Sequence, residues 1–314
     1  MGSTAKSLIS VHDLGDDELR SIVQRGVDFA AGDHRRSLAG RVVGIYFAKT
    51  STRTRTAFSS GALRLGAGIV TFGPADLQTN TGESWEDTGR VFAGMLDVMV
   101  MRTAGDPAQM RAWAGDELAV INAMSAEEHP TQAMTDLTTL MQHFGRIDGL
   151  RVLYVGEGNN TATSFALAFT RFPGVLLELR TPPGYGLPPA VLATAGEQAA
   201  RTGGRVVQRH DMAGIPGGFD AVYTSRWQTT GSTKPTPDWR DVFAPFQVGL
   251  ELWRDSPDAV FLHDLPAHRG EEVTAEVLDG PMSIAFRQAD NKMYSAMAVL
   301  EWSRTPALRE DERE

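Results

Sequence analysis

The sequence predicts an α/β protein with two doubly wound parallel-sheet domains. Short apolar runs alternate with longer amphipathic segments along the chain, and a repeated strand-then-helix order is typical of parallel sheets covered by helices on both faces. The length of 314 residues suits two domains of ordinary size. A polar, glycine-bearing stretch at 145–150 follows a long helical pattern and marks the boundary between them.

Short apolar runs predict the strands, because a strand inside a parallel sheet is buried on both faces. The predicted strands are 41–47, 68–72, 97–101, 119–123, 151–155, 175–180, 205–209, 219–224, 258–262 and 282–286. Longer segments with apolar residues on one helical face predict the helices. These lie near 16–31, 54–66, 84–95, 107–114, 131–144, 162–171, 188–202, 246–254, 271–278 and 289–304.

Three segments rich in glycine, proline or threonine predict loops. Two of them, 181–189 and 213–218, lie at element ends. The third, 227–239, is long for a connection, and such loops often act as lids or binding loops. The expected domains are 1–146 and 147–288, with a C-terminal helix, 289–314, packing back on the first domain.

The charge balance and the lack of cysteine exclude several classes of protein. The net charge is −9, which argues against a nucleic-acid or anionic-membrane partner, because both need a basic surface. With no cysteine in the chain, disulfides, thiolate metal sites and cysteine nucleophiles are excluded. We find neither a signal-peptide pattern nor an apolar run of membrane-spanning length, and we expect a cytoplasmic protein.

The segment S-T-R-T-R at 51–55 predicts an anion-binding turn. It follows the apolar run 41–47, and a helical pattern begins directly after it. Backbone N–H groups, a helix dipole, hydroxyls and guanidinium groups would then surround one ligand. The carboxyl end of a strand is also where ligands bind in such sheets. The alternative is an ordinary helix cap with surface arginines.

Other polar residues stand at the ends of further predicted elements. Arg102 ends a predicted strand, and Pro130 at a first helical position places His129 and Gln132 at a helix N-terminus. These side chains would face the same crevice as the S-T-R-T-R turn. Each also has a common structural explanation, a solvated strand end for Arg102 and a structural histidine for His129.

Two more polar segments follow predicted strands. G-E-G-N-N at 156–160 lacks the third glycine of a dinucleotide-binding turn, so we do not expect NAD. Its paired asparagines, Asn159 and Asn160, suit a zwitterionic ligand, because an amide both donates and accepts hydrogen bonds. H-D-L-P-A-H-R-G at 263–270 holds two histidines, but nothing else clusters with them, and we expect no metal site.

Five motifs occur in order along the chain: S-T-R-T-R at 51–55, Arg102, H-P-T-Q at 129–132, G-x-G-N-N at 156–160 and H-x-L-P-A-H-R-G at 263–270. In these motifs the chain resembles the aspartate/ornithine carbamoyltransferase family over essentially its whole length. The resemblance implies an enzyme that moves the carbamoyl group of carbamoyl phosphate onto an amine of a small amino acid. It also implies a cleft between two α/β domains, a homotrimer with active sites at subunit boundaries, and neither a metal nor an organic cofactor.

By this resemblance, one set of residues binds carbamoyl phosphate. The set is Ser51, Thr52, Arg53, Thr54, Gln78, Arg102, His129, Gln132, Leu265 and Lys292. Residues 51–54 would hold the phosphate. Thr54, Arg102 and His129 would contact the carbamoyl oxygen and serve catalysis, and Gln132 would contact the carbamoyl amide.

Two members of this set need separate comment. Gln78 matches the family position that reaches into a neighbouring subunit's site, and the alternative is a surface loop residue. Lys292 stands where the family has an arginine near the carbamoyl group. A lysine keeps the charge but loses the forked hydrogen-bonding geometry of a guanidinium.

The residue types suit carbamoyl transfer. An amine attacks a carbonyl carbon, and negative charge builds on the carbonyl oxygen before phosphate leaves. Donors fixed around that oxygen stabilise the developing charge, and arginines stabilise the leaving phosphate. Positioning two bound reactants accelerates the reaction further, while closure of the site excludes water as a competing nucleophile.

The acceptor pocket departs from the ornithine branch of the family. Ser225 stands where that branch has the aspartate that binds the α-ammonium group, and Thr229 replaces a serine. Arg226 and Gln228 match the R-x-Q with which the aspartate branch binds substrate carboxylates. The alternative for Arg226 is an ion pair on the surface.

Asp264 replaces a cysteine that faces the reacting amine in the ornithine branch. A carboxylate is thus lost at position 225 and gained at position 264. Asp264 would pair with the acceptor ammonium or take its proton as a general base, which also makes it a catalytic candidate. Removing that proton matters because an amine is protonated at neutral pH and does not attack in that form.

We therefore expect a small diamino acid, such as 2,3-diaminopropionate, as the acceptor. The expected acceptor-binding residues are Asn160, Ser225, Arg226, Gln228, Thr229 and Asp264. One alternative is an ordinary ornithine carbamoyltransferase that makes citrulline. Another is a non-catalytic paralogue that binds carbamoyl phosphate or an amino acid. Aspartate is disfavoured, because Thr81 stands where that branch has a lysine.

Overall fold

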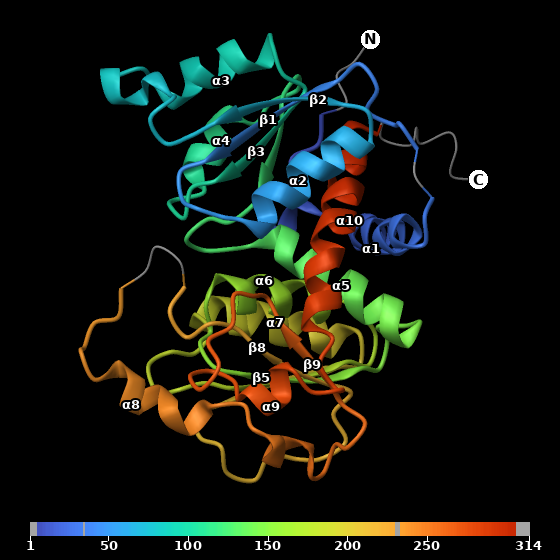
Figure 1. Ribbon diagram of the computed structural model, residues 1–314, viewed down its shortest axis with the longest axis vertical. Coiled ribbons are helices and arrows are strands. Elements are labelled where there is room, and N and C mark those ends of the chain that lie inside the picture. The colour runs from blue at the N-terminus through green and yellow to red at the C-terminus, as the bar shows by residue number, and fades with distance from the viewer. Residues whose placement is uncertain (1–4, 34, 230–232, 306–314) are drawn as a thin grey trace. The chain divides into compact units, whose positions relative to one another are not determined.

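Two compact units of parallel α/β structure make up the chain (Figure 1). The computed structural model describes residues 5–33, 35–229 and 233–305. One unit contains the residues up to Thr131 and those from Lys292 onwards, and the other contains residues 132–291. Each unit is built on a parallel sheet with a helix between most pairs of successive strands, which confirms the predicted fold class.

The first unit carries a parallel sheet in the order β2-β1-β3-β4. Its strands are β1 (Val42–Phe47), β2 (Gly68–Phe72), β3 (Val98–Arg102) and β4 (Ala119–Asn122). Its helices are α1 (Asp16–Ala30), α2 (Arg53–Arg64), α3 (Trp85–Ala93) and α4 (Ala108–Trp113). β3 and β4 are buried throughout, whereas the edge strand β2 is largely exposed. The apolar runs form strands here because both faces of the central strands are covered.

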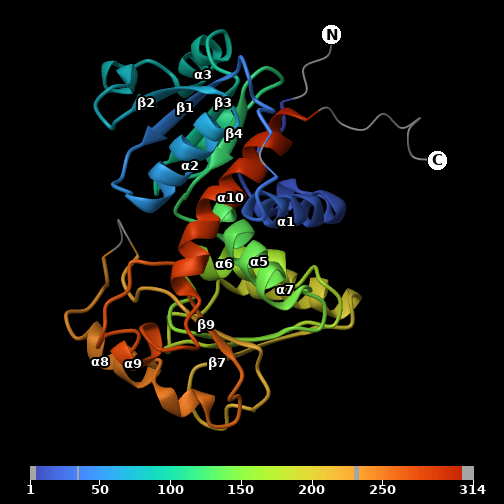
Figure 2. The ribbon, with the colours of Figure 1, turned by 45° about the vertical axis from the view of Figure 1, so that its right-hand side comes forward.

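The second unit carries a parallel sheet in the order β7-β6-β5-β8-β9. Figure 2 labels its two edge strands, β7 and β9. Its strands are β5 (Arg151–Val155), β6 (Leu176–Arg180), β7 (Arg205–Arg209), β8 (Ala221–Thr224) and β9 (Val260–His263). Its helices include α5 (Pro130–Phe144), α6 (Asn160–Phe169), α7 (Pro189–Arg201), α8 (Trp239–Phe243), α9 (Ala275–Leu278) and the start of α10 (Ala285–Arg304). Leu153, Val222 and Phe261 from three neighbouring strands are fully buried in one apolar cluster.

In each sheet the strand order reverses once. From β1 the chain continues to β2 on one side and to β3 and β4 on the other. From β5 it continues to β6 and β7 on one side and to β8 and β9 on the other. Loops that leave the carboxyl ends of strands at such a reversal diverge, and α/β proteins bind ligands there. The segments after β1, β3, β5 and β8 therefore stand where a ligand site is expected.

The structure corrects two of the predicted elements near the C-terminus. Residues 282–286 do not form a strand, because Ser283 makes only an isolated bridge to Phe261 and α10 begins at Ala285. The apolar run is too short for a strand once the chain turns into this helix. The predicted helix 271–278 is also shorter, and only α9 is helical.

The predicted helix 246–254 is wrong as well. The segment forms two 3-10 turns, 244–246 and 250–253. Between them Val248 pairs with Val273 in an isolated parallel bridge. Because that bridge takes the backbone groups of Val248, a continuous helix cannot form. The α-helical turn lies earlier, at α8, directly after a segment whose composition predicts a loop.

The part of α10 from Lys292 onwards belongs to the first unit. Its Glu301 forms an ion pair with Arg25 of α1 at 2.6 Å, and its Met297 lies against Gly61 of α2. Positions 306–314, which the sequence predicts as part of this helix, lie outside the described residues. Within the described ranges, no helix has both the length and the apolarity needed to cross a bilayer.

Candidate active site

The turn between β1 and α2 carries the S-T-R-T-R segment. Helix α2 begins at Arg53, and its N-cap residue Thr52 makes no capping hydrogen bond with its side chain. The N–H of Thr56 bonds the Thr52 carbonyl oxygen at 3.1 Å, so the N–H groups before it point out of the helix start. Thr54 is buried, and Ser51 and Arg53 are half-buried. The turn therefore offers hydroxyls, backbone donors and a positive dipole end to an anion.

Arg102, His129 and Lys292 form a buried cluster in the first unit. Arg102 ends β3, His129 precedes α5, and Lys292 lies on α10. All three side chains belong to residues that are 8 % exposed or less. Burial, and then the positive charges of Arg102 and Lys292, hold the pKa of His129 well below its ordinary value. Two buried cations beside a neutral imidazole attract negative charge.

Gln78 lies in the 3-10 turn Gln78–Thr81 and is exposed. An exposed position agrees with both interpretations of the sequence, a surface loop residue or a residue that contacts a second subunit. The position of Gln78 therefore does not separate them.

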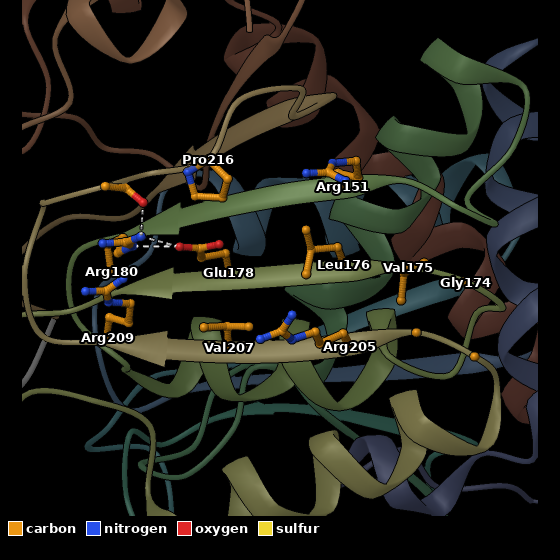
Figure 3. A pocket seen from close by; sticks show the side chains of 13 residues that line it. Arg151, Gly174, Val175, Leu176, Glu178, Arg180, Arg205, Val207, Arg209 and Pro216 are labelled. Atoms are coloured by element: carbon orange, nitrogen blue, oxygen red, sulfur yellow. Dashed lines mark hydrogen bonds and ion pairs between the residues drawn. The ribbon is translucent and has the colours of Figure 1, made fainter. Parts of the chain in front are cut away.

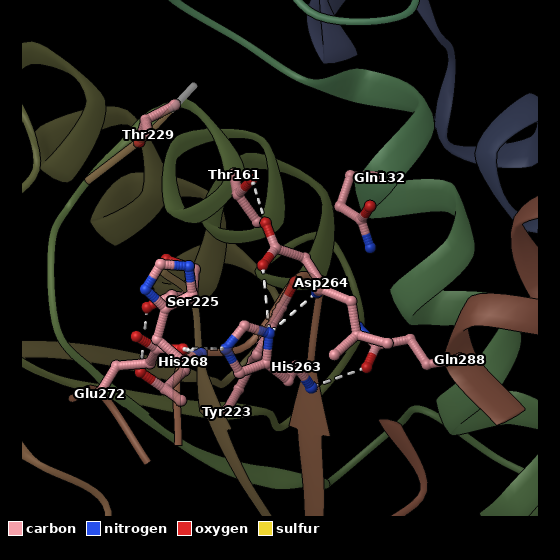
Figure 4. A network of polar contacts seen from close by, with 12 residues as sticks. Gln132, Thr161, Tyr223, Ser225, Thr229, His263, Asp264, His268, Glu272 and Gln288 are labelled. Atoms are coloured by element: carbon pink, nitrogen blue, oxygen red, sulfur yellow. Dashed lines mark hydrogen bonds and ion pairs between the residues drawn. The ribbon is translucent and has the colours of Figure 1, made fainter. Parts of the chain in front are cut away.

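Gln132 is held by a buried carboxylate. Its Nε2 donates to Asp136 Oδ1 at 2.7 Å. Asp136 also accepts from Gln288 Nε2 at 2.7 Å and from the Tyr223 hydroxyl at 2.9 Å. The side-chain Oε1 of Gln288 in turn accepts from the backbone N–H of His263 at 2.8 Å. Asp136 thus connects Gln132, through Gln288, to the end of β9. Figure 4 shows the contact between Gln288 and His263.

Several loops of the second unit meet at the N-terminus of α6 (Figure 4). Asn159 caps this helix, and its Oδ1 accepts from the N–H groups of Thr161 at 3.0 Å and Ala162 at 3.1 Å. Its Nδ2 donates to Ser225 Oγ at 3.0 Å and to Thr229 Oγ1 at 3.2 Å. One amide thus joins the loop after β5 to the loop after β8. Asn160, the first residue of α6, is buried beside it.

Ser225 is buried, and protein groups occupy its hydroxyl. Its Oγ lies 2.7 Å from the hydroxyl of Tyr154, which itself donates to the Glu157 carbonyl oxygen at 3.0 Å. Because the phenol has one proton, Ser225 donates to Tyr154 and accepts from Asn159. Burial raises the pKa of Tyr154 well above its ordinary value, so the phenol keeps that proton. Ser225 therefore holds the start of the loop after β8 in place.

Asp264 follows β9 and reaches the same helix start. Its Oδ2 accepts from Thr161 Oγ1 at 3.0 Å, and its side chain is 18 % exposed. The positive end of the α6 dipole favours a negative charge there. The structure thus brings Ser225, Thr229 and Asp264 to one helix N-terminus, where a carboxylate remains accessible.

His263 fixes the backbone that follows β9. Its Nδ1 accepts from the N–H of Leu265 at 2.8 Å, which puts the ring proton on Nε2, where it bonds Glu272 Oε1 at 3.1 Å. Leu265 has a φ of +51°, a conformation that few residues with a side chain adopt. His263 therefore serves the loop geometry, and within the described ranges no group of His, Asp or Glu is arranged to hold a metal.

Arg226 and Gln228 follow β8 and are half-buried. Within the described part of the chain, Arg226 has no ion pair, so the structure gives no support to the surface-pair alternative. Lys234, from the long segment 227–239, forms an ion pair with Glu157 of the turn after β5. Its Nζ also lies 4.9 Å from the ring centroid of Tyr185. These contacts tie the long segment to that turn.

The sequence did not reveal the residues that hold the site residues and their loops in place. Asp136 had a detectable signal, since it is the one carboxylate of this helix and stands one helical turn after Gln132. The asparagines at 159 and 160 were interpreted as ligand-binding groups, and the helix cap and loop contacts of Asn159 were not predicted. Glu272 gave no local signal, because its role depends on a contact with His263 that only the folded chain makes.

Comparison with known protein families matches both halves of the chain. Residues 6–142 match the carbamoyl-P binding domain of aspartate/ornithine carbamoyltransferase. Residues 148–303 match the Asp/Orn binding domain of the same family.

Individual relatives agree over nearly full length. The ornithine carbamoyltransferase of Symbiobacterium thermophilum is 39 % identical over 302 residues, covering 94 % of this chain and 96 % of the relative. The solved structure of ornithine carbamoyltransferase from Pyrococcus furiosus superposes with a TM-score of 0.87 at 34 % identity, covering 96 % of this chain and 97 % of that one. That from Gloeobacter violaceus gives a TM-score of 0.85 at 32 % identity, covering 96 % of this chain and 100 % of that one. Because both domain models match and the relatives agree over nearly the full length, the chain belongs to the aspartate/ornithine carbamoyltransferase family.

Proposed function

We propose that this carbamoyltransferase moves the carbamoyl group of carbamoyl phosphate onto the side-chain amine of a diamino acid, with ornithine as the acceptor. The observation that carries the proposal is the buried cluster of Arg102, His129 and Lys292 beside the carboxyl end of β3. A cluster of cations around a neutral imidazole suits an anionic donor with a polarised carbonyl.

In this proposal the donor is held by two groups of the first unit. Residues 51–54 bind the phosphate with the free N–H groups and hydroxyls of the turn before α2. Arg102 and Lys292 stabilise the charge on the carbamoyl oxygen. His129 is neutral because burial and the neighbouring cations lower its pKa, and a neutral ring donates from one nitrogen to that oxygen. Gln132, held by Asp136, is oriented for the carbamoyl amide.

The acceptor part of the proposal rests on relatives and on the α6 N-terminus. The relatives compared above are named ornithine carbamoyltransferases, and their resemblance extends over both domains, which supports ornithine. In the second unit, Asp264 supplies an accessible carboxylate for an ammonium group. Arg226 has no ion pair within the described residues and suits the substrate carboxylate.

One observation favours a shorter diamino acid, such as 2,3-diaminopropionate, as a second candidate. The buried Ser225 hydroxyl is engaged by Tyr154 and Asn159, so it provides no carboxylate for an α-ammonium group. The negative charge stands instead at Asp264. A pocket with its charge moved to another loop would prefer an acceptor with different spacing between its amines.

An acceptor panel tests the proposal. Ornithine, 2,4-diaminobutyrate, 2,3-diaminopropionate and aspartate are each supplied with carbamoyl phosphate, and ureido product and phosphate are measured. The highest kcat/KM with ornithine supports the first candidate, and the highest with 2,3-diaminopropionate replaces it with the second. Preference for aspartate would refute both. Absence of product with every amine, despite carbamoyl phosphate binding, would indicate the non-catalytic paralogue.

We also propose three properties that the family resemblance supports. The active form would be a homotrimer in which Gln78 reaches a neighbouring subunit's site. The reaction would need no metal or organic cofactor, and the protein would act in the cytoplasm. Sedimentation of the purified protein gives the oligomeric state, and mixing Gln78→Ala with Arg53→Ala subunits would restore activity only if sites are shared.

A further inference from the structure

A cavity of about 500 Å³ lies on one face of the second sheet (Figure 3). Alternate residues of β6 and β7 line it, together with Arg151 of β5. The strand register aligns Arg151 with Leu176 and Leu176 with Arg205. Neighbouring strands lie about 4.8 Å apart, so the two arginines flank Leu176 from either side. None of these residues belongs to the proposed active site.

The charges of the cavity are only partly balanced. Four arginines and a single carboxylate line it: Arg151, Arg180, Arg205, Arg209 and Glu178. Protein carboxylates already pair with Arg180: its Nε donates to Glu178 at 2.8 Å, and its Nη1 forms an ion pair with Asp211 at 3.2 Å. Arg209 shares Asp211 at 3.4 Å. The positive excess is a local feature, because the whole chain has a net charge of −9.

Two of the arginines retain hydrogen-bonding capacity. Arg151 donates from Nη2 to the Gly217 carbonyl oxygen at 3.2 Å, but its buried Nε has no acceptor within the described residues. A buried donor without an acceptor is uncommon and points to a missing partner. Arg205 is exposed, and the described part of the chain gives it no ion pair. Arg205, and the N–H donors of Arg151 that Gly217 does not take, are therefore available to an oxyanion.

The floor between these arginines is apolar. Leu176 and Val207 stand on neighbouring strands and line the cavity together with Val175. An inorganic ion would leave this surface in water, whereas an organic anion would cover it. We propose that this cavity binds a small organic phosphate or carboxylate, with its apolar part on Leu176 and Val207 and its oxyanion between Arg151 and Arg205.

The bound anion would not overlap with the acceptor. Arg151 begins β5, whereas Asn159 follows the opposite end of that strand. Arg151 and Arg205 thus lie at the amino-terminal edge of the sheet, and the α6 N-terminus lies at its carboxyl-terminal edge. The proposed position of the oxyanion, between Arg151 and Arg205, is therefore separate from the proposed acceptor-binding residues of the second unit.

The simpler explanation is a charged edge strand. β7 is at the edge of its sheet, and charged side chains on edge strands prevent aggregation. That explanation covers Arg205 and Arg209 but not Arg151, which lies on the central strand β5 with a buried, unsatisfied Nε. It also does not account for the apolar floor.

The test uses 8-anilinonaphthalene-1-sulfonate, an aromatic body with one oxyanion, in a fluorescence titration of the full chain. Arg205→Glu should weaken its binding about tenfold or more, because a charge-assisted hydrogen bond is replaced by repulsion. The matched control is Arg201→Glu, which makes the same charge change at an exposed residue at the end of α7. That control should bind like the wild type. Turnover measured for both variants reports that they fold.

Competition identifies the chemistry of the ligand. Displacement of the probe by phenyl phosphate assigns a phosphate, and displacement by benzoate assigns a carboxylate. The proposal is overturned if the probe does not bind, if neither oxyanion displaces it, or if both variants bind it equally. Because the readout is binding, these outcomes are independent of whether the acceptor is ornithine.

Discussion

At the scale of single residues, His129 makes stability depend on pH. In an unfolded chain a histidine titrates near pH 6.5, whereas burial and nearby cations lower the pKa of His129 in the fold. Between these two pKa values the unfolded chain binds more protons, so the free energy of unfolding falls as the pH drops below about 6.5. The slope contributed by one such group is at most about 1.4 kcal/mol per pH unit.

His129→Gln should remove this contribution. Urea unfolding between pH 8 and 5 is expected to show a shallower loss of stability for the variant than for the wild type, by up to about 2 kcal/mol at pH 5. His12→Gln, at an exposed histidine, provides the comparison and should follow the wild type. Parallel curves for His129→Gln and the wild type would contradict a buried neutral imidazole.

Asp264 is the residue on which the acceptor proposal depends. Asp264→Asn keeps an oxygen for Thr161 but removes the negative charge, so KM for the diamino acid should rise about tenfold or more. Asp279→Asn removes a carboxylate from an exposed ion pair with Arg269 and serves as the control. Steady-state kinetics measure KM for the diamino acid in both variants. If Asp264→Asn has the same KM as Asp279→Asn, Asp264 does not bind the acceptor.

The sequence identifies site residues that belong to local patterns, but not those that act through contacts with distant parts of the chain. The turn at 51–55 and Arg102 were visible because strand ends and helix starts are local patterns. Asp136 and Glu272 were not assigned, since each acts through a side chain that another element brings to it. The hydrogen bond between Ser225 and Tyr154 could not be predicted from the sequence either, because it joins neighbouring strands that are far apart along the chain.

At the scale of elements, the turn after β5 depends on a close backbone contact. A Cβ at Gly158 would stand 2.3 Å from the Leu187 nitrogen and 2.4 Å from the Gly186 carbonyl carbon. Backbone atoms cannot yield as a flexible side chain would, so the turn would have to move. The same turn carries Asn159, which joins the loops after β5 and β8.

Gly158→Ala should therefore destabilise the protein by about 2 kcal/mol or more and raise KM for the acceptor. Gly196→Ala is the matched control, since it lies in α7 with nothing within 4 Å of the added Cβ, and it should stabilise by about 0.5–1 kcal/mol. Chemical denaturation and kinetics measure both effects. A Gly158→Ala protein as stable as the control would disprove the close contact.

The sequence predicted best those strands that are buried on both faces of the sheet. β3 and β4 are buried at every position, and their apolar runs gave their positions directly. The errors lie in 246–254 and 282–286, where apolar residues are buried by turns and by single bridges. Apolar content indicates burial there, but long-range pairing decides which backbone conformation achieves it.

At the scale of the whole molecule, the two domain matches and the two parallel sheets together identify the chain as a carbamoyltransferase. The fold class followed from the alternation of strands and helices, and the motifs in order gave the family. The acceptor did not follow, because it depends on a few side chains in loops after β8 and β9. The central claim is that residues 51–54 at the start of α2 bind the phosphate of carbamoyl phosphate.

The most direct measurement is turnover and carbamoyl phosphate affinity of Arg53→Ala beside Arg64→Ala. Arg53 begins α2, and Arg64 ends the same helix as an exposed residue. Loss of a charge-assisted contact to the leaving phosphate should lower kcat/KM for carbamoyl phosphate about 100-fold or more in Arg53→Ala, while Arg64→Ala keeps wild-type kinetics. Unchanged kcat/KM and donor affinity in Arg53→Ala would contradict the account.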